Sequence, residues 1–404
     1  MRRLLPLAAF ALCWTGQALA EEFFADGLLD LRLAETSVNK SGSQGGWGTL
    51  RYGGSGSDQS TRAELGQISV MGGTQLTKDI LLYAQAKYDP AQKTAFDLVE
   101  AYARYRPVSL SRWRWSVKGG AFFPPISLEN TAVGWTSPWT LTPSAINSWV
   151  GEELRTIGGE GKLEWRGDQD LLEITGALFW DNDTAGTALA ERGWVLTDRV
   201  VGLLDRLRLP DELGREYHQL PLFTDPFLEI DGRPGWYGGL SWQRPDIGTV
   251  SLLRYDNQAD PSSFRRQFAW RTSFWSLGGV TDWDEFEIIS QLMAGSTEID
   301  PSPDDHSVTD FQAGYLLAGY AFDDWRLALR GELFATQTRD SGVDAHAGEH
   351  GHAVTLAVTY RPMEHLRITA EAIRSMAWRG ERSEFNLPAG TADTLLQLGV
   401  RVFF

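Results

Sequence analysis

The stretch TLLQLGVRVFF, residues 394–404, alternates between two kinds of side chain along its length. Every second residue from Leu396 to Phe404 is apolar, whereas Gln397, Gly399 and Arg401 occupy positions between them. Neighbouring side chains of a β-strand point to opposite faces, so a period of two predicts a strand with one apolar and one polar face. Such a strand needs an apolar environment on one side and polar groups or water on the other.

The same alternation recurs along the chain, for example at 354–360, 325–335 and 170–180. The predicted strands that contain these segments run for about ten residues, which suits a tilted bilayer crossing, whereas soluble strands usually have about five or six. A soluble all-β protein also alternates, but its packed core does not tolerate many unpaired inward charges. We therefore predict an all-β fold, a transmembrane antiparallel β-barrel of about 16 strands around a water-filled lumen. The predicted strands are 27–36, 61–71, 79–88, 96–106, 112–122, 156–165, 170–180, 235–243, 248–256, 264–277, 283–294, 309–320, 325–336, 351–361, 364–374 and 394–404.

The connections between these strands alternate in length, which is typical of an outer-membrane barrel with short periplasmic turns and long extracellular loops. Tryptophans near predicted strand ends, such as Trp113, Trp180 and Trp325, suit two interfacial girdles. The predicted short turns are 107–111, 166–169, 244–247, 321–324 and 362–363, and the predicted long loops are 37–60, 123–155, 181–234, 295–308, 337–350 and 375–393.

The first twenty residues have the pattern of a cleavable signal peptide. A basic start, Arg2-Arg3, precedes an apolar stretch, and Ala18-Leu19-Ala20 forms the expected cleavage site. The only cysteine, Cys13, lies inside this segment, so the mature part, 21–404, is predicted to be one barrel domain without disulfides. A net charge of −16 argues against nucleic-acid binding, which needs a basic footprint. The predicted location is therefore the bacterial outer membrane.

Two loops are expected to carry most of the functional detail. Loop 123–155 is rich in Trp, Pro and Ser/Thr, and we expect it to enter the barrel and narrow the bore, or to plug it. In the longest loop, 181–234, Thr197-Asp198 is expected to cap a short helix. The charged residues expected at the constriction are Glu129, Glu152, Glu153 and Arg155.

Charged residues on the inward faces of the strands are the other candidate pore lining. Basic rings select anions and acidic rings select cations, and here both occur. The alternative is that opposite charges pair across neighbouring strands and select nothing. The basic candidates are Arg104, Arg112, Arg114, Lys118, Arg326 and Arg330.

The sequence offers little for catalysis or cofactor binding. Three histidines, His346, His350 and His352, are weak metal candidates, because no preorganised helix is expected around them. No Gly-x-Ser-x-Gly or His-Glu-x-x-His arrangement occurs in the chain. We therefore predict neither an enzyme nor a cofactor.

Two segments, LVEAYARYRP (98–107) and WSVKGGAFFPPISLEN (115–130), resemble the phosphate-selective porins of Gram-negative bacteria. The aromatic C-terminus, Val402-Phe403-Phe404, resembles the signal by which outer-membrane barrels are recognised for assembly. The resemblance implies a trimeric, sixteen-stranded barrel that passes small solutes with a bias to anions. The residues it places in the basic pore lining are Arg104, Arg114 and Lys118.

The predicted function is that of a passive outer-membrane porin for small hydrophilic solutes. Its expected partners are outer-membrane lipid, small solutes or anions, and copies of itself in a homotrimer. Two alternatives stay open at this point. One is a plugged, non-conducting envelope barrel that binds a partner, and the other is a dedicated conduit for a larger substrate or polymer.

Overall fold

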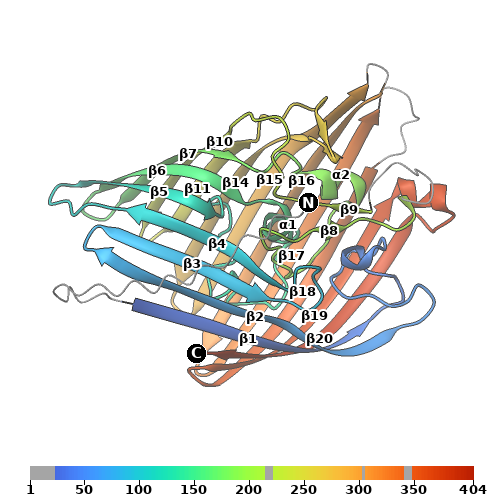
Figure 1. Cartoon of the computed structure of the whole chain (residues 1–404). Helices are drawn as coiled ribbons and strands as arrows, with labels where there is room; N and C mark the ends of the chain where they lie inside the picture. Colours follow the sequence, from blue (N-terminus) through green and yellow to red (C-terminus); the bar gives the residue numbers. More distant parts are fainter. Residues whose placement is uncertain (1–22, 214–221, 303–304, 341–347) are drawn as a thin grey trace.

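The computed structural model describes residues 23–213, 222–302, 305–340 and 348–404. The predicted signal peptide, 1–20, lies outside these residues. The described chain forms a closed barrel of sixteen antiparallel strands that follow one another around the wall in sequence order (Figure 1). The wall strands are β1 (Phe23–Thr36), β2 (Ser60–Thr77), β3 (Ile80–Tyr88), β4 (Phe96–Tyr105), β5 (Trp113–Phe122), β6 (Thr156–Arg166), β7 (Leu171–Trp180), β10 (Gly235–Arg244), β11 (Gly248–Asp256), β14 (Arg271–Trp283), β15 (Phe286–Ser302), β16 (Asp305–Phe322), β17 (Trp325–Asp340), β18 (Gly348–Met363), β19 (Leu366–Arg379) and β20 (Gly390–Phe403).

The last strand closes the barrel by pairing with the first. β20 lies antiparallel to β1 from Leu28 to Thr36, and the Phe404 carbonyl accepts a hydrogen bond from the Gly27 amide at 2.7 Å. On β20, Leu396 and Leu398 are exposed on the outside, whereas Gln397 is buried inside. The predicted fold, with its apolar outer and polar inner faces, is confirmed for this strand.

The barrel has a turn end and a loop end. The turn end carries the short connections, such as 167–170 and 323–324, and both ends of the described chain. The predicted long loop at 295–308 is wrong, because β15 continues to Ser302 and β16 begins at Asp305. Thr297 and Thr309 are paired and buried there, so the alternation of inward and outward residues continues into the segment that was predicted to be a loop.

The strand predicted at 264–277 begins later than expected. The wall strand β14 starts at Arg271, and the residues before it form a separate small hairpin. That hairpin consists of β12 (Phe264–Arg265) and β13 (Gln267–Phe268). Between them Arg266 has a φ of 66°, which turns the chain and prevents a continuous strand.

Parts of the long loops fold back inside the barrel (Figure 1). α1 (Ala145–Glu153), in loop 123–155, has all nine residues buried. It begins at Ser144, whose Oγ accepts a hydrogen bond from the Asn147 amide at 3.3 Å. No helix of the described chain is both long and apolar enough to cross a membrane. The smaller elements are η1 (Gly42–Gln44), α2 (Thr187–Glu191), β8 (Leu207–Arg208), β9 (Phe223–Thr224) and η2 (Gly380–Phe385).

An apolar core lies inside the barrel around α1. The Trp149 ring packs edge-on against Phe274 of β14 and Phe311 of β16, with centroids 5.4 Å and 5.2 Å away. Its other neighbour is Trp194, from the loop that follows β7, at 6.2 Å. At this level the lumen holds protein rather than water, because aromatic wall residues pack directly against the inserted helix.

Candidate functional site: the barrel interior

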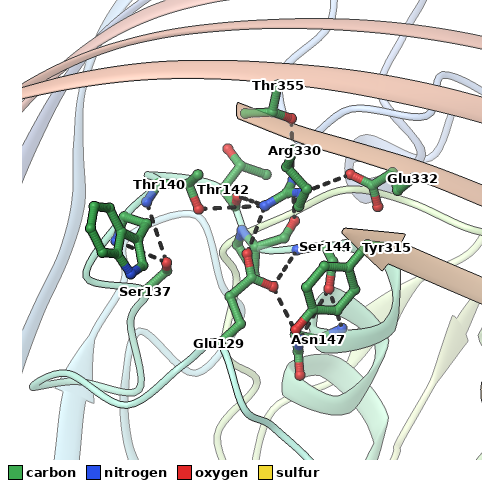
Figure 2. Close-up of polar contacts among 12 residues, drawn as sticks. Glu129, Ser137, Thr140, Thr142, Ser144, Asn147, Tyr315, Arg330, Glu332 and Thr355 are labelled. Carbon is green, nitrogen blue, oxygen red and sulfur yellow. Dashed lines mark hydrogen bonds and ion pairs between the residues drawn. The ribbon is translucent and has the colours of Figure 1, made fainter. Parts of the chain in front are cut away.

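One arginine holds loop 123–155 against the inner wall. Arg330 of β17 is fully buried, and its Nη1 lies 2.7 Å from an oxygen of Glu129, on the loop. Its Nε lies 3.0 Å from the carboxylate of Glu332, two residues further along the same strand. The guanidinium also donates to the carbonyls of Thr142 and Pro143 (Figure 2). We call the inner face of β17–β20 and β1, with the loop residues bound to it, the clamp.

The clamp also binds the N-terminus of α1. The second oxygen of Glu129 accepts from the Ser144 amide at 2.9 Å and from the Asn147 side chain at 3.1 Å (Figure 2). Glu332 accepts from the Ala145 amide at 2.7 Å. Two carboxylates therefore satisfy amides at the positive end of the helix, which stabilises the helix in this position.

Further wall residues continue the clamp toward β1. Glu371 of β19 accepts from the Leu141 amide at 2.6 Å, and Gln397 of β20 donates to the Thr142 hydroxyl at 2.8 Å. Arg401 donates to the Leu141 carbonyl at 3.2 Å and lies 2.8 Å from the Asp30 carboxylate. The polar inner faces of these strands are thus occupied by the backbone of loop 123–155.

A second loop reaches the clamp through Asp198. Its carboxylate pairs with Arg32 of β1 at 2.9 Å and with Arg51 at 2.5 Å. Burial alone would raise the pKa of Asp198, but these two guanidinium groups outweigh it and hold that pKa below its usual range. The helix expected to begin at Thr197-Asp198 is absent, and β8 lies within the same stretch. The Asp198 oxygens therefore pair with buried arginines and do not cap a helix.

The remaining predicted constriction residues lie at the C-terminal end of α1. Glu153 accepts from the Ala188 amide at 3.0 Å, and Glu152 pairs with Arg192 at 2.5 Å. The Arg155 guanidinium lies 3.5 Å from the Phe123 ring centroid. Glu152, Glu153 and Arg155, like Glu129, have no exposed surface. Loop 123–155 does enter the barrel, but Glu129, Glu152, Glu153 and Arg155 cannot line a pore because protein surrounds them.

The opposite wall keeps accessible charges. On β4 and β5, Arg104, Arg114 and Lys118 point inward and are only partly buried. Arg114 pairs with Glu164 of β6, and Lys118 lies 3.1 Å from Glu160. We call the accessible inner face of β3–β7, from mid-barrel to the turn end, the vestibule. Its other accessible residues include Tyr83, Tyr102, Ser116, Lys162 and Glu173.

The three other basic candidates differ from one another in position and exposure. Arg112 is not on the inner wall, because β5 begins one residue later, at Trp113. Its side chain is 58 % exposed in the turn and lies 2.8 Å from Asp168. Arg330 faces inward but is buried in the clamp. Arg326 faces inward near the turn end, is partly exposed, and donates to the Pro138 carbonyl at 3.1 Å.

The two histidine candidates that lie in the described chain do not face the lumen. His350 and His352 are exposed on the outer face of β18, where the His350 ring stacks on Trp378 at 5.3 Å. His346 lies outside the described residues. Sequence reasoning missed a group of carboxylates at the loop end, Asp183, Glu229 and Asp231, whose oxygens lie within 4.8 Å of one another. Asp183 lies 46 residues before Glu229 in the sequence, so no local spacing indicates the group.

No known family model matches the sequence, and no curated protein matches it. Solved structures do resemble the fold. An anion-selective porin from Comamonas acidovorans is 11 % identical with a TM-score of 0.55, over 95 % of this chain and 100 % of that one. The outer-membrane channel DcaP of Acinetobacter baumannii is 9 % identical with a TM-score of 0.54, over 97 % and 100 %. A loop-deletion mutant of OmpT, an outer membrane protein of Vibrio cholerae, is 11 % identical with a TM-score of 0.53, over 95 % and 99 %. At these identities the likeness establishes the fold alone.

Proposed function

We propose that the chain is an outer-membrane channel for small anionic solutes, closed toward the loop end by its own inserted loops. The outer-membrane location is supported by the apolar outer face, on which Leu396, Leu398 and Val354 are nearly half exposed. It is also supported by the predicted signal peptide and by the fold's likeness to outer-membrane barrels. In this location the turn end faces the periplasm.

The observation that carries the proposal is the vestibule. Arg114 and Lys162 keep 27 % and 29 % of their side-chain surface, which is expected of residues that line water. Arg104, also on this wall, has no acidic partner within 4.0 Å in the described chain, and its Nε has no hydrogen-bond partner. Arg114, Lys118 and Lys162 each face a carboxylate, so the unpaired guanidinium of Arg104 is the group on this accessible wall that favours anions over cations. A specific preference for phosphate belongs to the same proposal and rests on the family resemblance of this segment.

Solutes can cross the barrel only if loop 123–155 moves away from the inner wall. Its contacts with the clamp are hydrogen bonds and ion pairs, and these depend on geometry more strongly than apolar packing does. We expect the wild type to conduct weakly, and a variant with a weakened clamp to conduct more. The variant is Arg330→Gln, and its control is Arg374→Gln, which is exposed on the outer face of β19.

The test is conductance and reversal potential of the folded protein in a planar bilayer under a salt gradient. Weak, anion-biased current that rises in Arg330→Gln and not in Arg374→Gln would support the proposal. Silence of both the wild type and Arg330→Gln, in samples shown to be folded, would overturn it.

A second candidate function is a plugged barrel that binds a partner and conducts nothing. It is favoured by the way the loops join each other across the loop end. The Leu196 amide donates to the Thr49 carbonyl at 2.8 Å, and the Arg51 amide donates to the Leu196 carbonyl at 2.9 Å. A conduit for a polymer finds less support, because α1 and its aromatic neighbours occupy the bore.

We also propose that the protein forms a homotrimer. The wall strands from β3 to β7, with β10 and β11, have only 9 to 11 residues, so the wall is short on this side of the barrel. Its outer face carries Trp113, Trp115 and Val117, all about half exposed, which neighbouring copies could cover. Sedimentation of the purified protein in detergent would count the copies.

A further inference from the structure

We propose that three arginines at the turn end of the inner wall form a binding site for a small multivalent oxyanion such as phosphate. They are Arg326 of β17, Arg361 of β18 and Arg367 of β19. The site lies on the clamp side of the barrel, away from the basic residues of the vestibule. It goes beyond the proposed channel, because binding at this site does not require conduction.

The strand register places the three side chains together. Arg326 is opposite Thr359 of β18, and Thr359 is opposite Thr369 of β19. Arg361 and Arg367 each lie two residues from these threonines, toward the turn that joins β18 to β19. Arg326 and Arg367 keep the inward parity of their strands, Arg361 lies where the β18–β19 register shifts after Tyr360, and all three are partly buried. Arg367 interacts electrostatically with both Arg326 and Arg361, so the three guanidinium groups lie in one region near the turn end of the lumen.

None of the three has an acidic partner within 4.0 Å among the described residues. Arg326 donates to the Pro138 carbonyl, but its Nε and that of Arg361 are buried without a hydrogen-bond partner. Arg367 lies over the Phe403 ring, 4.3 Å from its centroid. The paired arginines of the same wall differ, since Arg330 and Arg401 each contact a carboxylate within 3 Å.

Electrostatics make this arrangement costly when it is empty. Arg367 lies within electrostatic range of Arg326, Arg361 and Arg401, all of like charge. The acid that acts electrostatically on Arg326 is Glu287, whose oxygen already accepts the indole N–H of Trp139. Clustered like charges in a partly desolvated site repel one another, and a bound anion removes that repulsion.

The residue type indicates the class of ligand. The guanidinium group is a planar fork whose N–H groups match two oxygens of a phosphate or carboxylate. Three forks around one region suit an ion with several oxygens better than chloride. The Thr359 and Thr369 hydroxyls lie 2.8 Å apart and bond to each other, so they already have a partner without the anion. The anion would therefore be held by the arginines.

The test is isothermal titration of inorganic phosphate into the full, folded barrel in detergent, at fixed ionic strength. Arg326→Gln, Arg361→Gln and Arg367→Gln should each weaken binding about tenfold, which is the loss expected for one charge-assisted hydrogen bond. Two controls should bind as the wild type does. Arg374→Gln changes an outer-face arginine of the same strand, β19, and Arg112→Gln changes an exposed arginine of a turn at the same end.

Sulfate should compete with phosphate at this site, whereas acetate at the same ionic strength should compete weakly. Trp139 offers a second readout, because its ring lies 5.2 Å from the Arg326 guanidinium, so phosphate should change the indole fluorescence. Absence of saturable binding in the wild type, or equal binding in the triple Arg→Gln variant, would overturn the site. Because calorimetry needs no current, a silent bilayer with intact phosphate binding would reject the channel and keep the site.

Discussion

The two sides of the barrel wall use their inward charges in opposite ways. In the clamp, Arg330, Glu332 and Arg32 keep at most 1 % of their side-chain surface. In the vestibule, Arg114, Lys162 and Glu173 keep between 23 % and 29 %. Both sets follow from the same strand alternation. The difference arises because loop 123–155 covers the clamp and also packs on β14 and β16, but leaves the inner face of β3–β7 toward the turn end accessible. The strand pattern determines which residues point inward, and loop packing determines which of them contact water.

The largest effect on stability is expected from Arg330→Met in the clamp. The change leaves the carboxylates of Glu129 and Glu332 buried without their counter-charge, and should lower the free energy of unfolding by about 3–5 kcal/mol. Urea unfolding of the purified barrel in detergent measures this.

The matched change in the vestibule is Arg114→Met. Its ion pair with Glu164 is partly exposed, so the same unfolding measurement should show a loss below about 1 kcal/mol. Equal losses in the two variants would remove the distinction between the two sides of the wall.

An effect smaller than that of Arg330→Met, but larger than that of Arg114→Met, is expected from the pH dependence of the inserted helix. Burial raises the pKa of Glu153 to about 7, although bonds from Ala188 and Trp149 favour the charged form. The folded state therefore binds this proton more tightly than the unfolded chain does. The resulting stability is complete below about pH 4.5 and is lost as pH rises through about 7.

Glu153→Gln should remove that dependence. Between pH 4.5 and 8 the wild type should lose about 3 kcal/mol more stability than the variant, by the free energy of the shift. The measurement is the free energy of unfolding across this pH range for both proteins. Parallel curves would show that Glu153 does not hold its proton in the folded barrel.

The smallest effect on stability, but a direct effect on selectivity, is expected for Lys118→Gln. Its partner Glu160 keeps a hydrogen bond from Tyr237, so stability should change by less than about 1 kcal/mol. The loss of a basic group from the vestibule should lower the preference for anions, measured as the reversal potential under a salt gradient. An unchanged potential would place the solute path elsewhere.

The wall could be predicted from the sequence because its signal is local. Alternation over ten residues locates a strand and both of its faces, as for Gln397 and Leu398 on β20. The errors occurred where the local signal was weak. Thr297 and Thr309 continue the pairing of β15 with β16 through a polar stretch whose composition predicts a loop. At Arg266 the positive φ interrupts the predicted strand 264–277.

The interior could be predicted only in part. The position of loop 123–155 in the chain indicated that it enters the barrel, and its Trp and Pro content agreed. Its charged residues were misplaced because their partners are remote: Arg330 is 201 residues from Glu129, and no spacing rule connects them. For the same reason the local pattern at Asp198 predicts a helix cap, although its partner Arg32 lies 166 residues away. Such pairs are set by tertiary packing.

The most direct test of the two-sided interior is thiol labelling, because the only cysteine of the chain, Cys13, lies in the predicted signal peptide. Ser116→Cys places a thiol on the partly exposed vestibule wall, and Thr355→Cys places one in the fully buried clamp beside Arg330. Each folded variant is treated with a charged, membrane-impermeant thiol reagent, and the rate of modification is measured. We predict rapid modification at 116 and protection at 355. Equal rates at the two positions would contradict the account, because loop 123–155 would then leave both walls open to water.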